Sequence, residues 1–207
     1  MIRFLQKSVS SFALATAVLL TACVTTMQLT AEWMDPSYRS HPGKIMVVGV
    51  AKAAVNRRIF EDEFVRKLGD HGVIAIASYT VLPDALQNDR KAIADKVAEL
   101  GADTVLITRL ANKKTVQTIV PGIVYNPPPF YGTWPEYYGY GYDTLYAPGY
   151  VVEEELSVIE SNLYSASNDK LIWTSTTEIG TSGSVQERIR NYIGIVMKSM
   201  AARGLLN

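Results

Sequence analysis

Few residues of this chain could do chemistry. It has one cysteine, Cys23, two histidines, His41 and His71, and a run of three glutamates from Glu153 to Glu155. Paired carboxylates can act as acid and base or hold calcium, but adjacent strand residues face opposite sides, so at most the outer two glutamates converge. The histidines lack metal-ligand spacing, and no serine lies in a nucleophile-elbow pattern. We therefore expect no catalytic residues, no metal and no cofactor, with structural histidines and a solvated strand edge at the glutamates.

The first 23 residues indicate what Cys23 does. Arg3 and Lys7 precede an uncharged run over residues 12–20, and Leu20-Thr21-Ala22 stands directly before the cysteine. A positive start, a short apolar segment and small residues before a cut site are typical of a signal peptide. The apolar run is too short for a membrane-spanning helix, which needs about 20 residues.

Residues 20–23 resemble the lipobox of bacterial lipoproteins. The resemblance implies that the signal is cut before Cys23, that the thiol receives a diacylglycerol and that the new amino terminus is acylated, for example with palmitate. Three acyl chains would exceed the roughly two signals that stable anchoring requires. Val24 follows the cysteine where an Asp would imply inner-membrane retention. The resemblance therefore implies a lipid anchor at the periplasmic face of the outer membrane.

Composition sets the size and the partner classes. Of 207 residues, 20 are Lys or Arg and 20 are Asp or Glu, and removal of residues 1–22 takes away Arg3 and Lys7 but no acid. Without a basic surplus, nucleic acid is not expected as a partner. With its single cysteine lipidated, the protein has no disulfides and depends on its hydrophobic core. We expect a signal peptide over 1–22, a lipidated tether over 23–42 and one domain over 43–207.

The first half of that domain alternates strand and helix patterns. An apolar run over 44–51 predicts a strand buried on both faces. Asn56 could cap the next helix, whose apolar face would carry Phe60, Phe64 and Leu68, with Glu61 among the charged residues opposite. Residues 73–82 predict a second strand, and residues 104–110 a third that continues as a twisted edge to 120. Between these two strands Asp89 and Gly101 mark the ends of a helix.

The second half predicts a hairpin and a final helix. Residues 151–164 and 171–179 have strand patterns and are joined by a polar turn. Ser184 and Glu187 form a capping box. It opens a helix with one apolar face, made of Val185, Ile189, Ile193, Val196 and Met200. The expected fold is an α/β (α+β) domain with a mixed sheet, in the order β-α-β-α-β, aromatic loop, β-β-α.

An aromatic insertion over residues 121–150 interrupts this pattern. It holds eight tyrosines, and its only charges are Glu136 and Asp143. Aromatic side chains offer large contact area at low rotamer cost, and so long a loop is usually functional or disordered. The alternative is a flap that folds over its own sheet. Absence of Lys and Arg argues against nucleic-acid stacking. The candidate partner-binding residues are Tyr125, Phe130, Tyr131, Trp134, Tyr137, Tyr138, Tyr140 and Tyr142.

The domain also resembles small bacterial lipoproteins of unknown function that carry a Tyr/Gly-rich insertion. The matching motifs are the strand start at residues 102–107, then Leu163-Tyr164, and Lys170-Leu171-Ile172-Trp173 before a terminal amphipathic helix. The same layout is similar to the penicillin-binding-protein activator lipoprotein, the N-terminal domain of the Tol translocation protein and the periplasmic domain of curli secretion lipoproteins. No catalytic residues belong to this resemblance.

Two functional classes follow from these observations. The favoured one is a non-enzymatic envelope adaptor that binds a protein or a peptidoglycan-type glycan through the aromatic loop. Its variant is a self-associating, homo-oligomeric accessory subunit of assembly or secretion. The alternative class is an envelope hydrolase or transferase with carboxylates that the sequence does not assign.

Overall fold

A six-stranded mixed sheet runs through the part of the chain that the computed structural model describes, residues 27–120, 133 and 149–206. Its order is β1-β6-β5-β4-β2-β3. The strands are β1 (Met27–Met34), β2 (Lys44–Val50), β3 (Ile74–Ala77), β4 (Thr104–Val120), β5 (Tyr150–Ser165) and β6 (Leu171–Gly180). The helices are α2 (Ala54–Asp70), α3 (Ser78–Val81), α4 (Arg90–Leu100) and α6 (Val185–Ala202), with a 3-10 turn η1 (Asp84–Leu86). The expected α/β class with one mixed sheet is confirmed.

Strand β2 is the centre of the parallel part of the sheet. It pairs with β3 on one side and with β4 on the other. Ile45 and Val47 join the core beneath α2 and α6, whereas Met46 and Val48 join a second cluster with α4 on the opposite face. Burial on both faces explains why the sequence of β2 is a continuous apolar run rather than an alternating one.

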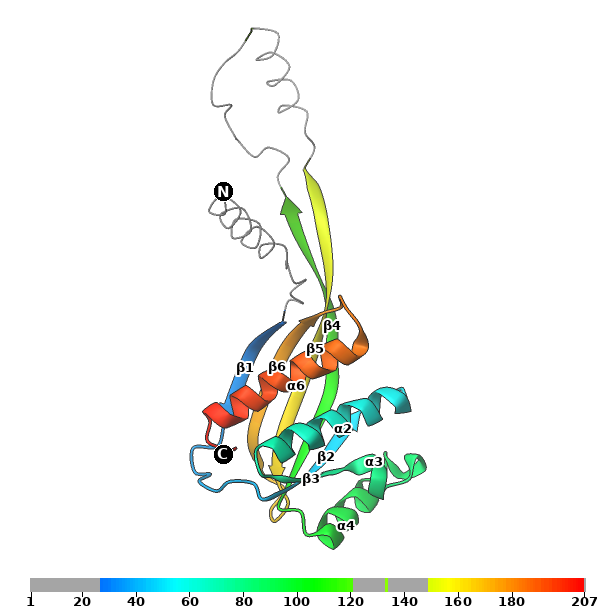
Figure 1. Ribbon diagram of the computed structural model, residues 1–207, viewed down its shortest axis with the longest axis vertical. Coiled ribbons are helices and arrows are strands. Elements are labelled where there is room, and N and C mark those ends of the chain that lie inside the picture. Colours follow the sequence, from blue (N-terminus) through cyan, green and yellow to red (C-terminus); the bar gives the residue numbers. More distant parts are fainter. Residues whose placement is uncertain (1–26, 121–132, 134–148, 207) are drawn as a thin grey trace, which may run out of the picture.

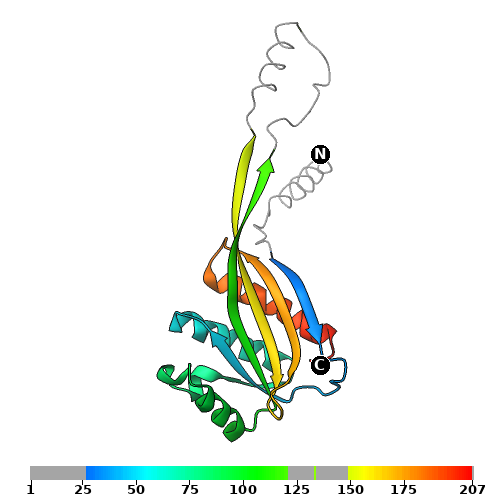
Figure 2. The same cartoon turned by 180° about the vertical axis from the view of Figure 1, so that it is seen from behind.

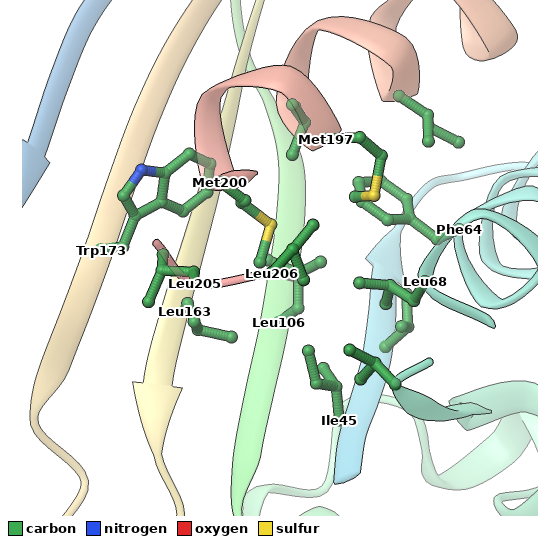
Figure 3. Close-up of a cluster of buried hydrophobic side chains, with 14 of the residues drawn as sticks. Ile45, Phe64, Leu68, Leu106, Leu163, Trp173, Met197, Met200, Leu205 and Leu206 are labelled. Carbon is green, nitrogen blue, oxygen red and sulfur yellow. The ribbon is translucent and has the colours of Figure 1, made fainter. Parts of the chain in front are cut away.

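The larger core lies between the sheet and the helices α2 and α6 (Figures 1 and 3). Phe64 and Leu68 of α2 and Met200 of α6 are fully buried there. Trp173, also fully buried, packs from β6 into the same cluster. Seen from behind, α4 lies on the other side of the sheet, away from α6 (Figure 2).

The predicted helix ends are largely confirmed. Asp89 accepts hydrogen bonds from the backbone of Lys91 and Ala92, and Gly101 ends α4 in the left-handed conformation at φ 61°. Ser184 and Glu187 form the expected capping box of α6. The start of α2 differs: its N-cap is Ala53, without a side-chain cap, and not Asn56.

Strand β1 occupies part of the segment for which the sequence predicted a tether. Residues 27–34 pair antiparallel with β6 at the edge of the sheet. Met27 and Met34 pack against the main core. A bulge between Leu29 and Ala31 shifts the alternation, which hides the strand pattern in the sequence.

The second predicted strand is shorter than expected. Only residues 74–77 pair with β2, and Ser78 begins a single helical turn, α3. Ser78 is fully buried, and its hydroxyl and the backbone N–H of Tyr79 both donate hydrogen bonds to Glu61. The chain therefore leaves the sheet at the point where it meets this carboxylate.

Candidate functional site

The end of the β4–β5 pair extends past every other strand that the structure describes. The last pair between β2 and β4 is Val50 with Arg109, and the first between β5 and β6 is Leu156 with Gly180. Residues 115–120 and 150–155 therefore pair only with each other, and we call them the distal ribbon. Figures 1 and 2 show it projecting from one end of the sheet.

The distal ribbon brings the two ends of the aromatic insertion together. Val120 pairs directly with Tyr150 in the antiparallel register. The sequence-based expectation that the flanking strands pair as neighbours is thereby confirmed. Residues 121–149 leave the domain and return to it at a single place.

The outer end of the distal ribbon is apolar and exposed. Ile119 is 76% exposed, Tyr150 59%, Val151 55% and Val152 44%. Directly paired residues share a face, so Ile119 and Val151 lie on one face while Val152 and Tyr150 lie on the other. Among the described residues, no helix or further strand covers either face, and exposed apolar groups gathered in this way mark interaction sites.

Polar groups dominate the base of the ribbon. Lys113 Nζ lies 2.7 Å from Glu155 Oε1, and Lys114 Nζ lies 2.6 Å from Glu178 Oε1 on β6. Gln117 donates a hydrogen bond of 2.6 Å to Glu153. As expected, Glu153 and Glu155 share a face, but each interacts with a cross-strand partner. These side chains therefore stabilise strand pairing and do not form an acid–base pair.

The sequence-predicted binding and lipidation residues lie outside the described part of the chain. This holds for Cys23 and for all eight aromatic candidates, namely Tyr125, Phe130, Tyr131, Trp134, Tyr137, Tyr138, Tyr140 and Tyr142. Of the histidines, His41 is exposed and His71 is the C-cap of α2. Within the described ranges, no three His, Cys, Asp or Glu side chains are grouped to hold a metal ion, and no helix is long and apolar enough to cross a membrane.

A buried ion pair is the main polar cluster that sequence reasoning missed. Arg57 is 2% exposed and Glu61 is 0% exposed, and Arg57 Nε donates to Glu61 Oε1 over 2.9 Å. Glu61 was predicted on the charged face of α2, which is wrong. Positions 57, 61, 64 and 68 share the spacing of the buried stripe that contains Phe64 and Leu68, and this was the available signal.

Every polar atom of this pair is used within the fold. The carboxylate of Glu61 also accepts from the backbone N–H of Gly49 and Tyr79, each over 2.9 Å, and from Ser78 Oγ over 2.7 Å. Arg57 donates to Ser78 over 2.8 Å and reaches Asp84 and Gln87. A satisfied cluster of this kind positions β2, α2 and α3 and offers no free group for catalysis.

A second polar cluster fixes β1 to the end of α6. Glu32 Oε2 accepts from both Nε and Nη2 of Arg203, at 2.8 and 2.6 Å. Glu32 Oε1 accepts from Ser199 and from Trp173 Nε1. Burial opposes ionisation of Glu32, but the hydrogen bonds from Arg203, Ser199 and Trp173 together outweigh it and lower the pKa of the carboxyl.

This lowered pKa predicts an acid-sensitive contact. A carboxyl whose pKa is lower in the folded state adds stability at neutral pH, and that stability is lost as pH falls through the folded-state pKa. We expect the Glu32→Gln variant to melt below the wild type at pH 7, and the difference to shrink below about pH 4, where free glutamates titrate. Paired thermal melts across pH check this. A difference in melting temperature that is constant down to pH 2 would contradict the role of the Glu32 charge.

Comparison with known proteins yields only distant structural likeness. No family model matches the chain, and no curated protein matches it in sequence. The PelC dodecamer from Paraburkholderia phytofirmans is 12% identical, with a TM-score of 0.44 over 83% of this chain and 96% of that chain. Lipoprotein GNA1162 from Neisseria meningitidis is 13% identical, with a TM-score of 0.41 over 78% of this chain and 99% of that chain. TM-scores below 0.5 support no functional conclusion for this chain.

Proposed function

We propose that this chain is a lipid-anchored protein of the bacterial envelope that acts as a non-enzymatic binding module. The anchor is Cys23, and the binding elements are the distal ribbon and the aromatic insertion that it carries. The observation that carries the proposal is the exposed apolar end of the ribbon, at which the insertion leaves and rejoins the domain. The partner classes that suit an uncharged, tyrosine-rich surface are an envelope protein and a glycan of the peptidoglycan type.

The architecture separates the proposed binding element from the folded core. The core between the sheet, α2 and α6 contains no residue of the distal ribbon. The ribbon is held by its own cross-strand pairs and by the ion pairs at its base. A binding element placed in this way can change without loss of the fold, as is usual for loops carried by a rigid scaffold.

Deletion of the insertion tests this proposal. We expect a chain in which a two-residue Asn-Gly turn replaces residues 121–149 to fold, because Val120 and Tyr150 are already paired and shortening a loop does not raise its closure entropy. Photo-crosslinking in intact envelopes should give specific adducts with the full chain and none with the deletion chain. Isolated peptidoglycan sacculi should separate the two partner classes, since a glycan partner predicts co-sedimentation that the deletion removes.

A deletion in the turn at the other end of the sheet provides the control. Replacement of the turn at residues 166–169 by Asn-Gly alters a loop far along β5 from the ribbon. It should leave adduct formation unchanged. Equal adducts from all three chains would refute the assignment of binding to the insertion.

A further inference from the structure

We infer that the exposed end of the distal ribbon docks on the lipid bilayer that holds the anchor. This inference rests on the proposed lipidation of Cys23, and it names the surface that the ribbon contacts. The contacting residues are Ile119, Tyr150, Val151 and Val152, all of which the structure describes.

The first step is the short connection between the anchor and the sheet. Strand β1 begins at Met27, so only residues 24–26 separate it from Cys23. Four Cα-to-Cα steps span at most about 14 Å. A lipid on Cys23 would therefore hold the Met27 end of β1 close to the membrane surface, where a tether through residue 42 would have let the domain move far away.

The second step is the direction of the ribbon. Met27 pairs with Ile179, Ile179 pairs with Ser157, and Ser157 pairs with Lys113, so these residues form one row across the sheet. From Lys113, β4 runs seven residues further to Val120, away from the body of the sheet. Figure 1 shows the start of β1 and the base of the ribbon at the same end of the domain.

The third step compares the two lengths. Seven residues of a strand rise about 23 Å, whereas the connection to Cys23 reaches at most about 14 Å. An upright ribbon would therefore pass the level of the anchoring cysteine by roughly 9 Å, the difference of these two spans. A tilted ribbon would lie along the headgroups. Both arrangements place the end of the ribbon at the bilayer.

The side chains change along the ribbon in the way this placement requires. The outermost three pairs contain no charged residue, and the first acid, Glu153, pairs with Gln117 just below them. Three residues of strand correspond to about 10 Å, which matches the depth of 5–10 Å that interfacial segments reach. The ion pairs of Lys113 and Lys114 lie further down, at the level where water is expected.

Depth-dependent fluorescence quenching tests the inference on the full lipidated chain in phosphatidylcholine vesicles. Lipidation blocks the thiol of Cys23, the only native cysteine, so a single introduced cysteine takes the fluorophore. A label at Val151→Cys should be quenched by nitroxide lipids labelled near the headgroup. A label at Asn168→Cys, in the turn at the opposite end of β5, should not be quenched.

A charge placed beside the label makes the test specific. Adding Ile119→Asp, across from Val151, should reduce the membrane-inserted fraction about tenfold, because a buried aspartate strongly disfavours insertion. Val55→Asp is the matched control, since Val55 is similarly exposed but lies on α2. It should leave the quenching unchanged, and the melting temperatures of both variants report whether the fold is intact.

The remaining outcomes overturn the inference in distinguishable ways. A Val151 label that is open to aqueous iodide but not to lipid quenchers means that the domain stands off the membrane. Shielding from both quenchers means that a protein or a second copy of the chain covers the ribbon. A chain that does not associate with vesicles, and whose Cys23 reacts with the fluorophore, refutes the proposed anchor as well.

Discussion

Replacing Glu61 by alanine is expected to lower the free energy of unfolding by about 3–5 kcal/mol, because the change leaves Arg57 charged, buried and without its main partner. Arg57 is 2% exposed, so water cannot take the place of the carboxylate. The backbone N–H groups of Gly49 and Tyr79 would also lose their acceptor. Denaturant unfolding at pH 7 measures the effect.

Two further variants identify the cause of that loss. Glu99, which is exposed on α4, is paired with Lys96, and Glu99→Ala should cost less than about 1 kcal/mol, as is usual for exposed pairs. The double variant Arg57→Met with Glu61→Leu removes the uncompensated charge and should be more stable than Glu61→Ala alone. It should remain below the wild type, since the two N–H groups still lack an acceptor. A Glu61→Ala variant as stable as Glu99→Ala would contradict the role given to the buried pair.

Replacing Cys23 by serine is expected to abolish lipidation and membrane retention completely. A hydroxyl does not replace the thiol that the lipobox resemblance implies as the site of diacylglycerol attachment. The variant should accumulate as an uncleaved or mislocalised precursor and incorporate no radiolabelled palmitate. With no acyl chain, nothing supplies the roughly two signals that a stable anchor needs.

The control for this variant lies in the same leader. Ser8→Ala changes the amino-terminal region but leaves residues 20–23 intact, and it should be processed and labelled like the wild type. Palmitate incorporation and membrane fractionation report both results. Normal processing and fractionation of Cys23→Ser would contradict the anchor, and with it the inference that the ribbon docks on the bilayer.

Local sequence signals predicted most of the fold. Asp89, Gly101 and the pair Ser184 and Glu187 are caps whose geometry depends on neighbours within a few residues. The apolar run of β2 reports burial on both faces, which is also a local property. These signals predicted the alternation of strands and helices and the mixed sheet.

Non-local contacts account for what the sequence did not predict. Strand β1 is held by β6 and by Glu32, whose partner Arg203 is 171 residues away. The second strand ends early because Ser78 and Tyr79 meet the carboxylate of Glu61 on α2. A charged residue on a helix usually faces water, so the spacing of Arg57 and Glu61 with the buried stripe could be recognised only after the fold was known.

The candidate binding site was predicted in part for the same reason. Pairing of Val120 with Tyr150 could be expected, because two strand patterns flank the insertion. The extension of the ribbon past its neighbours could not, since it depends on where β2 and β6 stop. Exposure of Ile119 and Val151 follows from that difference in length.

The thermal melt of a chain with Trp134, Tyr137 and Tyr138 replaced by alanine tests the central claim most directly. If the insertion is a binding surface and not part of the core, the melting temperature should change little while adduct formation in envelopes is lost. If these aromatic side chains were packed as a flap over the domain, each truncation would cost about 3–5 kcal/mol. A large fall in melting temperature with unchanged adduct formation would contradict the account.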